Sequence, residues 1–196
     1  MLPELTEAMS GAWFLAPTIP NFTSIYDAEY FRRYRERDQT PMGAKLTRAR
    51  VELVRRHARG LHTVDVGVGG GRFMDELPCK GHDINPAALE WMNGRHWDYS
   101  RVPVLTFWDS LEHVFAPETY LVMADRWVFI SMPIYRDLEH VLSSKHLKPN
   151  EHLWYFTRDG LVTLLRRTGF ELVEESDVES ALGREDVMSF AFRRVR

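Results

Sequence analysis

One aspartate and four glycines form the most specific motif in the chain, because residues 65–71 run Asp-Val-Gly-Val-Gly-Gly-Gly. Glycines let a backbone turn tightly and approach a ligand closely. A helix that begins after the run would offer free N–H groups and a positive dipole end, which suit an anion or a zwitterion. The dinucleotide pattern G-x-G-x-x-G does not fit, because its third glycine would fall on Arg72 or Met74. The loop therefore predicts an anionic or zwitterionic ligand.

A second acid, Asp83, follows twelve residues after Gly71, where a second strand is expected to end. A carboxylate at that place can accept hydrogen bonds from both hydroxyls of a ribose. The alternative is that the glycines only turn the chain and that Asp83 only caps the next helix.

Further acids and histidines fall in two short segments, with Asp109, Glu112 and His113 in the first and His152 in the second. On adjoining strand ends, two carboxylates and two imidazoles could bind Mg²⁺ or Mn²⁺ and lower the pKa of a coordinated hydroxyl. Without a metal, His113 or His152 could act alone as a general base, since the ordinary pKa of histidine is near neutrality. Glu112 and His113 would then serve mainly to hold the helix that follows.

The hydrophobic pattern predicts helices and strands in alternation. Helices are expected over residues 28–59 (one or two), 72–77, 86–93, 117–124 and 157–168. Strands are expected over 63–67, 81–84, 104–108, 127–131, 170–173 and 187–192, and the fourth of these should end before Pro133. Only a stub fits between Gly94 and Val102, so one strand is abbreviated. The stretch 134–156 is either a lid over the acceptor or a surface excursion.

This order predicts an α/β fold with a Rossmann-like, doubly wound, mostly parallel sheet and a terminal antiparallel strand. In such folds ligands bind beyond the carboxyl ends of the strands. The length indicates one domain over residues 1–196, with 1–60 as a helical cap or leader and 61–196 as the core.

Composition narrows the protein class. A lone cysteine, Cys79, can form neither an internal disulfide nor a cysteine-rich zinc site. The start of the chain lacks a signal-peptide pattern, and no run of ~18 apolar residues occurs. We therefore expect a cytoplasmic protein that does not enter a membrane.

Charge is unevenly distributed along the chain, although the net charge is only −3. Residues 32–59 carry ten Lys and Arg against three acids, whereas residues 171–186 are acidic. The basic segment could hold RNA phosphates. Alternatively, it is the solvated face of a helix whose apolar stripe comprises Leu46, Ala49, Leu53 and Val54.

Taken together, residues 64–194 resemble the class I S-adenosylmethionine-dependent methyltransferases. The resemblance implies that Asp65 and the loop Gly67, Val68, Gly69, Gly70 and Gly71 hold the methionine end of the cofactor. It further implies that Asp83 binds the ribose, Ile84 packs on the adenine, and Trp108 with Asp109 lines the cofactor. The abbreviated strand leaves Trp97 or Asp98 as the candidate for binding the adenine amino group.

Two segments resemble the subgroup of ubiquinone-biosynthesis methyltransferases: residues 109–113 match D-x-L-E-H, and residues 152–157 match H-x-x-x-F-T. The chain also resembles methyltransferase-like proteins of bacteria and phages. In ubiquinone-biosynthesis and small-RNA 2′-O-methyltransferases, an E-x-x-E-H motif binds a divalent metal, joined in the RNA enzymes by a later histidine. The resemblance implies Asp109, Glu112, His113 and His152 as metal ligands, with Asp109 replacing the first glutamate.

The expected activity is methyl transfer to a hydroxyl or another nucleophile of a small molecule or RNA, with His113, His152 and Glu112 activating the acceptor. DNA base methylation is disfavoured, because Asp109-Ser-Leu-Glu stands where amino-methyltransferases carry a [DNS]-P-P-[YFW] motif, and Pro78-Cys79 is misplaced for cytosine C5 chemistry. The alternatives are a non-catalytic S-adenosylmethionine-binding protein and a nucleic-acid-interacting protein. The sequence does not predict the oligomeric state.

Overall fold

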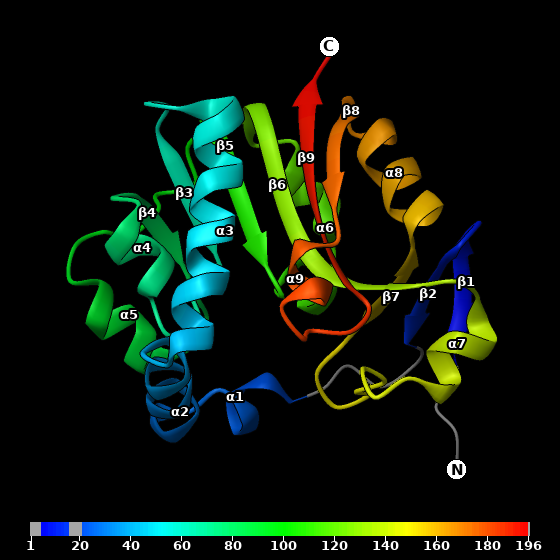
Figure 1. Cartoon of the computed structure of the whole chain (residues 1–196), viewed down its shortest axis with the longest axis horizontal. Helices are drawn as coiled ribbons and strands as arrows, with labels where there is room; N and C mark the ends of the chain where they lie inside the picture. Colours follow the sequence, from blue (N-terminus) through cyan, green and yellow to red (C-terminus); the bar gives the residue numbers. More distant parts are fainter. Residues whose placement is uncertain (1–4, 16–20, 196) are drawn as a thin grey trace.

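Nine strands form one mixed sheet in the computed structural model, which describes residues 5–15 and 21–195. The central strands β4 (Lys80–His82), β3 (Thr63–Val66), β5 (Val102–Trp108) and β6 (Ala124–Tyr135) pair in parallel in that order (Figure 1). Strand β9 (Val187–Arg194) pairs antiparallel with β6 and with β8 (Phe170–Ser176). The predicted Rossmann-like fold with a terminal antiparallel strand is confirmed.

The abbreviated strand is also confirmed. Among the described residues, the region between α5 (Pro86–Met92) and β5 contributes a single isolated bridge, in which His96 pairs with Gly81. The sheet therefore ends at β4, with little chain beyond it.

Helices cover both faces of the sheet. On one face, α3 (Pro41–Ala58) packs Val51, Val54 and Ala58 against Val104 and Trp108 of β5 and their neighbours (Figure 1). On the other face, α6 (Pro117–Leu121) and α8 (Arg158–Arg167) pack against the opposite side chains of β5 and β6. Alternate residues of β5 thus face different helices, as expected for a strand buried on both sides. The remaining helical elements are α1 (Phe22–Ile25), α2 (Ala28–Asp38), α4 (Arg72–Glu76), the 3₁₀ helix η1 (Leu111–His113), α7 (Leu138–Ser143) and α9 (Val178–Ala181).

Local sequence explains where these helices begin. The side chains of Asp27, Thr40, Asn85 and Thr157 each accept a hydrogen bond from a backbone N–H in the first turn of the following helix. Such caps satisfy N–H groups that the helix itself leaves unpaired. None of the helices in the described ranges is both long and apolar enough to span a bilayer.

Two features differ from the sequence prediction. Strand β6 continues through Pro133. The proline loses no hydrogen bond to β5, because β5 ends at Trp108, which pairs with Ser131. The expected leader contains a hairpin of β1 (Leu5–Met9) and β2 (Ala12–Leu15), which pairs with β7 (Trp154–Thr157). Residues 1–4 and 16–20 of that leader lie outside the described residues.

Candidate active site

A cavity of about 950 Å³ opens at the carboxyl ends of β3, β4 and β5, where the fold predicts a ligand. The glycine loop after β3 and the segment after β5 form its floor. Helices α1 and α2 and residues 145–152 lie across it, and Figure 1 shows α1 and α2 beyond the strand ends. The cavity is near the upper end of the ~300–1,000 Å³ range of small-ligand sites.

The glycine loop is held in left-handed backbone conformations, with φ of 80° at Gly67, 54° at Gly69 and 83° at Gly71. Gly67 is required by space as well, since a Cβ there would lie 2.5 Å from the Cβ of Ser110. The loop residues that line the cavity are Gly67, Val68, Gly69 and Gly70. The loop can therefore cradle a ligand with its backbone.

Gly71 does not line the cavity, contrary to the expected cofactor contact. A side chain there would collide with the indole ring of Trp91 on α5. The last glycine of the motif therefore permits helix packing, and it starts α4 as the N-cap residue.

Asp65 and Asp83 both line the cavity. The Asp65 carboxyl group is buried at the end of β3 and accepts a hydrogen bond from the Thr106 hydroxyl over 2.7 Å. The carboxylate of Asp83 accepts one from the Val68 N–H over 2.9 Å and one from the Asn85 N–H over 2.8 Å. A carboxylate oxygen can accept more than one hydrogen bond, so Asp83 could also accept one from a ribose hydroxyl.

Ile84 and Trp108 also line the cavity. Ile84 is 55% exposed, an unusual state for isoleucine, and a bound base could cover it. Trp108 is buried, and its Nε1 has no hydrogen-bond partner among the described residues. Its indole N–H is therefore available to a ligand acceptor.

Neither Trp97 nor Asp98, the residues expected to bind the adenine amino group, lines the cavity. The Trp97 indole donates to the Ser100 carbonyl, and Asp98 pairs with Lys80 at the surface. His82 and Tyr120, joined by a hydrogen bond of 3.2 Å, line this end of the cavity instead.

Asp109 belongs to a buried cluster of two arginines and two acids. Its carboxylate accepts two hydrogen bonds of 2.8 Å from Arg184 and one of 2.9 Å from Arg50. Both arginines also pair with Glu179, which is fully buried and accepts from the Ser131 hydroxyl over 2.6 Å. Burial opposes ionisation, but the two arginines hold the pKa of Asp109 below its ordinary value.

The remaining predicted metal ligands come together without Asp109. Ligand atoms of Glu112, His113 and His152 all lie within 4.8 Å of one another. Both carboxyl oxygens of Glu112 are buried and have no hydrogen-bond partner in the part of the chain that the structure describes. Asp109 stays apart because its oxygens are already bound by Arg50 and Arg184.

Burial keeps this group uncharged at neutral pH. It raises the pKa of Glu112 to about 8, helped by the nearby negative charge of Asp109. Burial also lowers the pKa of His113, and with the neighbouring His113 it lowers that of His152 to about 2. A neutral carboxylic acid therefore faces two neutral imidazoles.

The hydrogen bonds of His113 define its proton positions. Its Nδ1 lies 2.8 Å from the Glu151 carbonyl oxygen, which can only accept, so Nδ1 must carry the proton. In the neutral ring Nε2 then bears the lone pair. The Tyr26 hydroxyl also contacts Nδ1, at 3.0 Å, and fixes the ring further.

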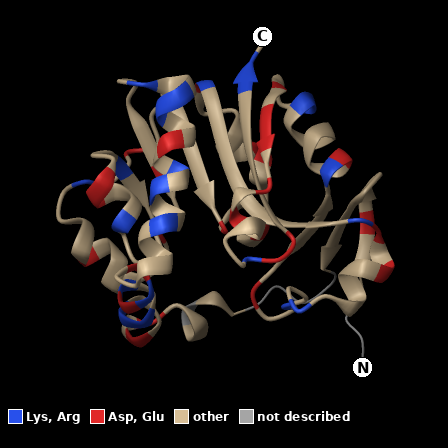
Figure 2. Cartoon of the chain, in the orientation of Figure 1, with Lys and Arg blue, Asp and Glu red and all other residues tan. Residues whose placement is uncertain are grey.

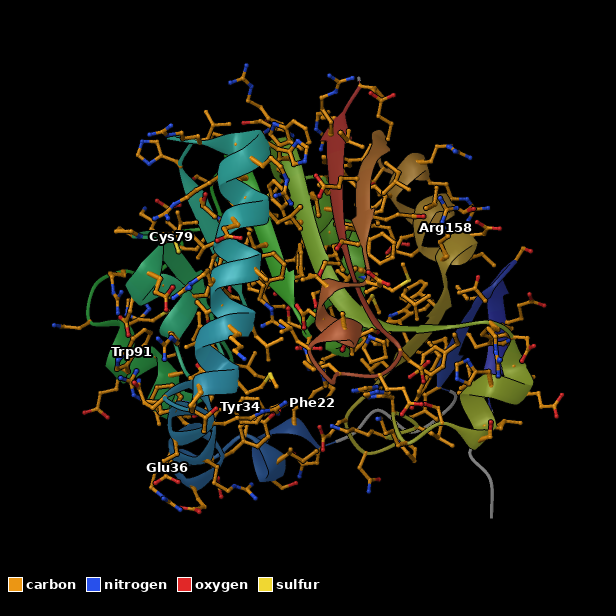
Figure 3. The ribbon with its side chains drawn as sticks, in the orientation of Figure 1. Phe22, Tyr34, Glu36, Cys79, Trp91 and Arg158 are labelled. Atoms are coloured by element: carbon orange, nitrogen blue, oxygen red, sulfur yellow. The ribbon has the colours of Figure 1, made fainter. Side chains whose placement is uncertain are left out.

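Sequence analysis missed the aromatic residues of the cavity roof. Phe22, Tyr26, Tyr30 and Tyr34 are spaced four residues apart and all line the cavity. Figure 3 places Phe22 and Tyr34 on the side of α1 and α2 that faces the sheet, and Glu36 on the opposite side. The four-residue spacing was the available signal, because within a helix it puts side chains on one face, as it does for Tyr30 and Tyr34 of α2.

Three of the ten basic residues of segment 32–59 form ion pairs with acids in the described part of the chain. Arg50 belongs to the buried cluster, Arg56 pairs with Glu174 of β8, and Arg32 pairs with Glu29 and Glu36. Figure 2 shows the basic residues along α3 and the acidic ones along β8. The opposite charges of the two segments thus partly neutralise each other, which leaves less free positive charge for RNA phosphates than the sequence predicts.

A family model described as a methyltransferase domain matches residues 31–175, which is well over half of the chain. The chain belongs to this family. Its glycine loop, its sheet order and the cavity at the strand ends make it a class I S-adenosylmethionine-dependent methyltransferase. The finer resemblance to the ubiquinone-biosynthesis subgroup stays a prediction.

Solved structures share the fold of this methyltransferase. One is the 1,6-didemethyltoxoflavin-N1-methyltransferase of Burkholderia thailandensis with bound 1,6-didemethyltoxoflavin and S-adenosylhomocysteine, with a TM-score of 0.62, 15% identity and coverage of 98% of this chain and 100% of that chain. Another is the magnesium protoporphyrin IX methyltransferase of Synechocystis PCC 6803 with bound S-adenosylhomocysteine, with a TM-score of 0.61, 15% identity and coverage of 89% and 100%.

A third is a possible histamine N-methyltransferase of Thermotoga maritima, with a TM-score of 0.61, 18% identity and coverage of 85% and 97%. At these identities the likeness concerns the fold. No curated protein matches the methyltransferase by sequence.

Replacing one charged member of the buried ion cluster by a neutral residue should lower the stability of the protein strongly. Glu179→Gln leaves both arginines with a single carboxylate, so we expect the free energy of unfolding to fall by about 3 kcal/mol at pH 7 in urea denaturation. The control is Glu171→Gln, which removes a partly exposed ion pair and should cost less than about 1 kcal/mol. Equal losses would contradict the account of the cluster.

The raised pKa of Glu112 predicts that the stability of the protein depends on pH. Because its pKa in the folded protein, about 8, is above the unfolded value of about 4.3, its contribution to stability is lost as the pH rises between them. Relative to the parent protein, Glu112→Gln should therefore gain at least about 2–4 °C in Tm between pH 5 and pH 8.5. Exposed Glu118→Gln should show a pH-independent difference, and the same behaviour for Glu112→Gln would refute the raised pKa.

Proposed function

We propose that this methyltransferase methylates an acidic hydroxyl or N–H group of a small molecule, with His113 as the general base. The observation that carries the proposal is the fixed tautomer of His113, whose Nδ1–H donates to the Glu151 carbonyl. The lone pair on Nε2 is then available to a proton of the acceptor. His152 and Glu112 surround this base with neutral groups, so that burial does not trap a charge before reaction.

The residues proposed to bind the cofactor are taken from the lining of the cavity. We infer that Asp65 and the loop Gly67 to Gly70 hold the amino-acid end, that Asp83 holds the ribose, and that Ile84 covers the adenine. Trp108 contributes its free indole N–H. Asp109 acts indirectly, because its carboxylate is bound by arginines and positions the segment 110–113.

When bound, S-adenosylmethionine supplies a methyl group on a positively charged sulfur. The protein's part is to align the acceptor atom with that methyl group and to exclude water, which is how enzymes accelerate displacements of this kind. Nε2 of His113 accepts the proton that the acceptor loses. Solved relatives support a small-molecule acceptor, since 1,6-didemethyltoxoflavin is bound in one and protoporphyrin is named for another.

A divalent metal is the alternative way to activate the acceptor. The oxygens of Glu112, which have no hydrogen-bond partner among the described residues, and the two imidazoles form a set of one carboxylate and two nitrogen ligands. Two nitrogen ligands and one carboxylate suit Mn²⁺ better than Mg²⁺, which prefers oxygen. A metal there would bind the ionised form of Glu112, in place of the neutral carboxyl group described above.

Replacement of His113 tests the proposed base. Acceptors are found by screening phenols and ring N–H compounds for S-adenosylhomocysteine release. On any acceptor found, His113→Ala should lower kcat by about 10²–10⁴ while leaving the affinity for S-adenosylhomocysteine unchanged. The exposed His62→Ala is the control.

The same assay separates the base from the metal. With His113 as the base, turnover persists in EDTA. Loss of turnover in EDTA that Mn²⁺ restores would show that a metal, and not His113 as a base, activates the acceptor. Full activity of His113→Ala would reject both mechanisms.

A further inference from the structure

The aromatic row of Phe22, Tyr26, Tyr30 and Tyr34 is continuous from the glycine loop to His113. Adjacent ring centroids lie 5.8 Å apart for Phe22 and Tyr26, 4.9 Å for Tyr26 and Tyr30, and 4.5 Å for Tyr30 and Tyr34. At one end, a Cβ on Gly69 would lie 3.7 Å from the ring of Tyr34. The row therefore roofs the whole path from the cofactor loop to the proposed base.

Towards its other end the row reaches His113. There Tyr26 contacts His113, with its hydroxyl 3.0 Å from Nδ1 and its ring centroid 6.3 Å from that of the imidazole. Phe115, two residues beyond His113, lines the same cavity and is 58% exposed. An exposed phenylalanine inside a cavity indicates an apolar surface that a ligand covers.

From this arrangement we propose that the acceptor is a planar aromatic molecule, held against Tyr26 and Phe115, with a ring hydroxyl or ring N–H directed to His113. The inference rests on the proposed function and names its substrate class. Aromatic rings bind one another in stacked or edge-to-face geometry, and the rings of Tyr26 and Phe115 both line the cavity.

The ordinary acidities of hydroxyl groups favour the same class. A phenol, like tyrosine, has a pKa of about 10, within reach of a neutral imidazole during reaction. A simple aliphatic hydroxyl is closer to water, whose pKa is about 15.7, and would need stronger activation.

The charge at this entrance is mixed. Arg37 and Asp38 of α2 both line the cavity. Lys145 and Lys148, which line it too, are paired with Glu185 and Glu151. RNA binding depends on basic groups that replace counterions, so RNA is an alternative outcome of the test below.

The transfer step balances without a further reactant. The acceptor's oxygen or nitrogen forms a bond to the methyl carbon while the carbon–sulfur bond breaks and its electron pair stays on sulfur. The acceptor proton passes to Nε2 of His113, and the resulting imidazolium returns it to solvent. The products are a methylated ring substituent, S-adenosylhomocysteine and one proton.

The test uses 2-naphthol, which is planar and phenolic, and its saturated analogue decahydro-2-naphthol. Both are titrated by calorimetry into the full-length protein saturated with S-adenosylhomocysteine. We expect 2-naphthol to bind at least about tenfold more tightly than the saturated analogue. Equal affinities, or no binding of 2-naphthol, would overturn the inference.

Variants of Tyr26 separate its ring from its hydroxyl. Tyr26→Leu, which removes the ring, should weaken 2-naphthol binding about fivefold. Tyr26→Phe, which keeps the ring, should bind 2-naphthol within about twofold of the parent protein. Weakening in both variants to the same extent would show that the ring does not hold the probe.

Two further outcomes distinguish a failure of the proposed function from a failure of the aromatic acceptor. If S-adenosylhomocysteine itself does not bind, the proposed function fails and takes this inference with it. If S-adenosylhomocysteine binds but a single-stranded RNA oligomer, and not 2-naphthol, is methylated, the aromatic acceptor is wrong and the methyltransferase assignment stands.

Discussion

The buried cluster of Arg50, Asp109, Glu179 and Arg184 connects the parts of the molecule that surround the cavity. Arg50 comes from α3, Asp109 from the end of β5, and the other two from the loop region between β8 and β9. Buried ion pairs cost desolvation energy, and they are tolerated when every charge has well-oriented partners, as these have. The four charges cancel, and their hydrogen bonds hold Asp109 in a left-handed conformation with φ of 55°.

That conformation sets the direction of the chain leaving β5, and thereby the position of Glu112 and His113. The backbone of this segment is tied on its far side as well, since the Leu153 N–H donates to the Glu112 carbonyl over 2.8 Å. Both anchors are distant in sequence from the residues that they position. The geometry of the base is thus fixed by the fold, as expected for a site that must be organised before its ligands arrive.

Burial and ion pairing together explain which acids of the site are charged. The carboxyl group of Asp65 has a pKa raised to about 7 for the same reason that Glu112 is neutral, because water is excluded from these positions. Arginines accompany Asp109 and Glu179, whereas no cation accompanies Glu112 among the described residues. Neighbouring acids therefore differ in charge because their partners differ. The arginines hold Asp109 and Glu179 in the negative form, and Glu112 is neutral.

The local motifs were predictable from sequence because their requirements are local. Residue type and spacing indicate the glycine loop, Asp83, the helix caps and the abbreviated strand. The alternating pattern indicates the succession of helices and strands along the chain. The pairing of Asp109 with Arg184 was not predictable, because 75 residues separate them and neither side chain has a local signature. Arg50 was counted with the exposed basic residues for the same reason.

Other misses also come from tertiary contacts. The hairpin β1–β2 forms against β7, whose position is defined only in the folded chain. Gly71 looked like a ligand contact, yet it makes room for Trp91, which the motif itself does not reveal. The aromatic row had a readable four-residue spacing, but its orientation toward the cavity depends on where α2 packs.

The most direct test of the cofactor site is a calorimetric titration of the protein with S-adenosylhomocysteine, beside Asp83→Ala and the exposed control Asp75→Ala. The account predicts micromolar binding by the parent protein and the control, and a loss of about 10–100-fold for Asp83→Ala, the effect of removing charge-assisted hydrogen bonds to ribose. Absence of binding by the parent protein, or unchanged binding by Asp83→Ala, would contradict the assignment of this cavity as the cofactor site.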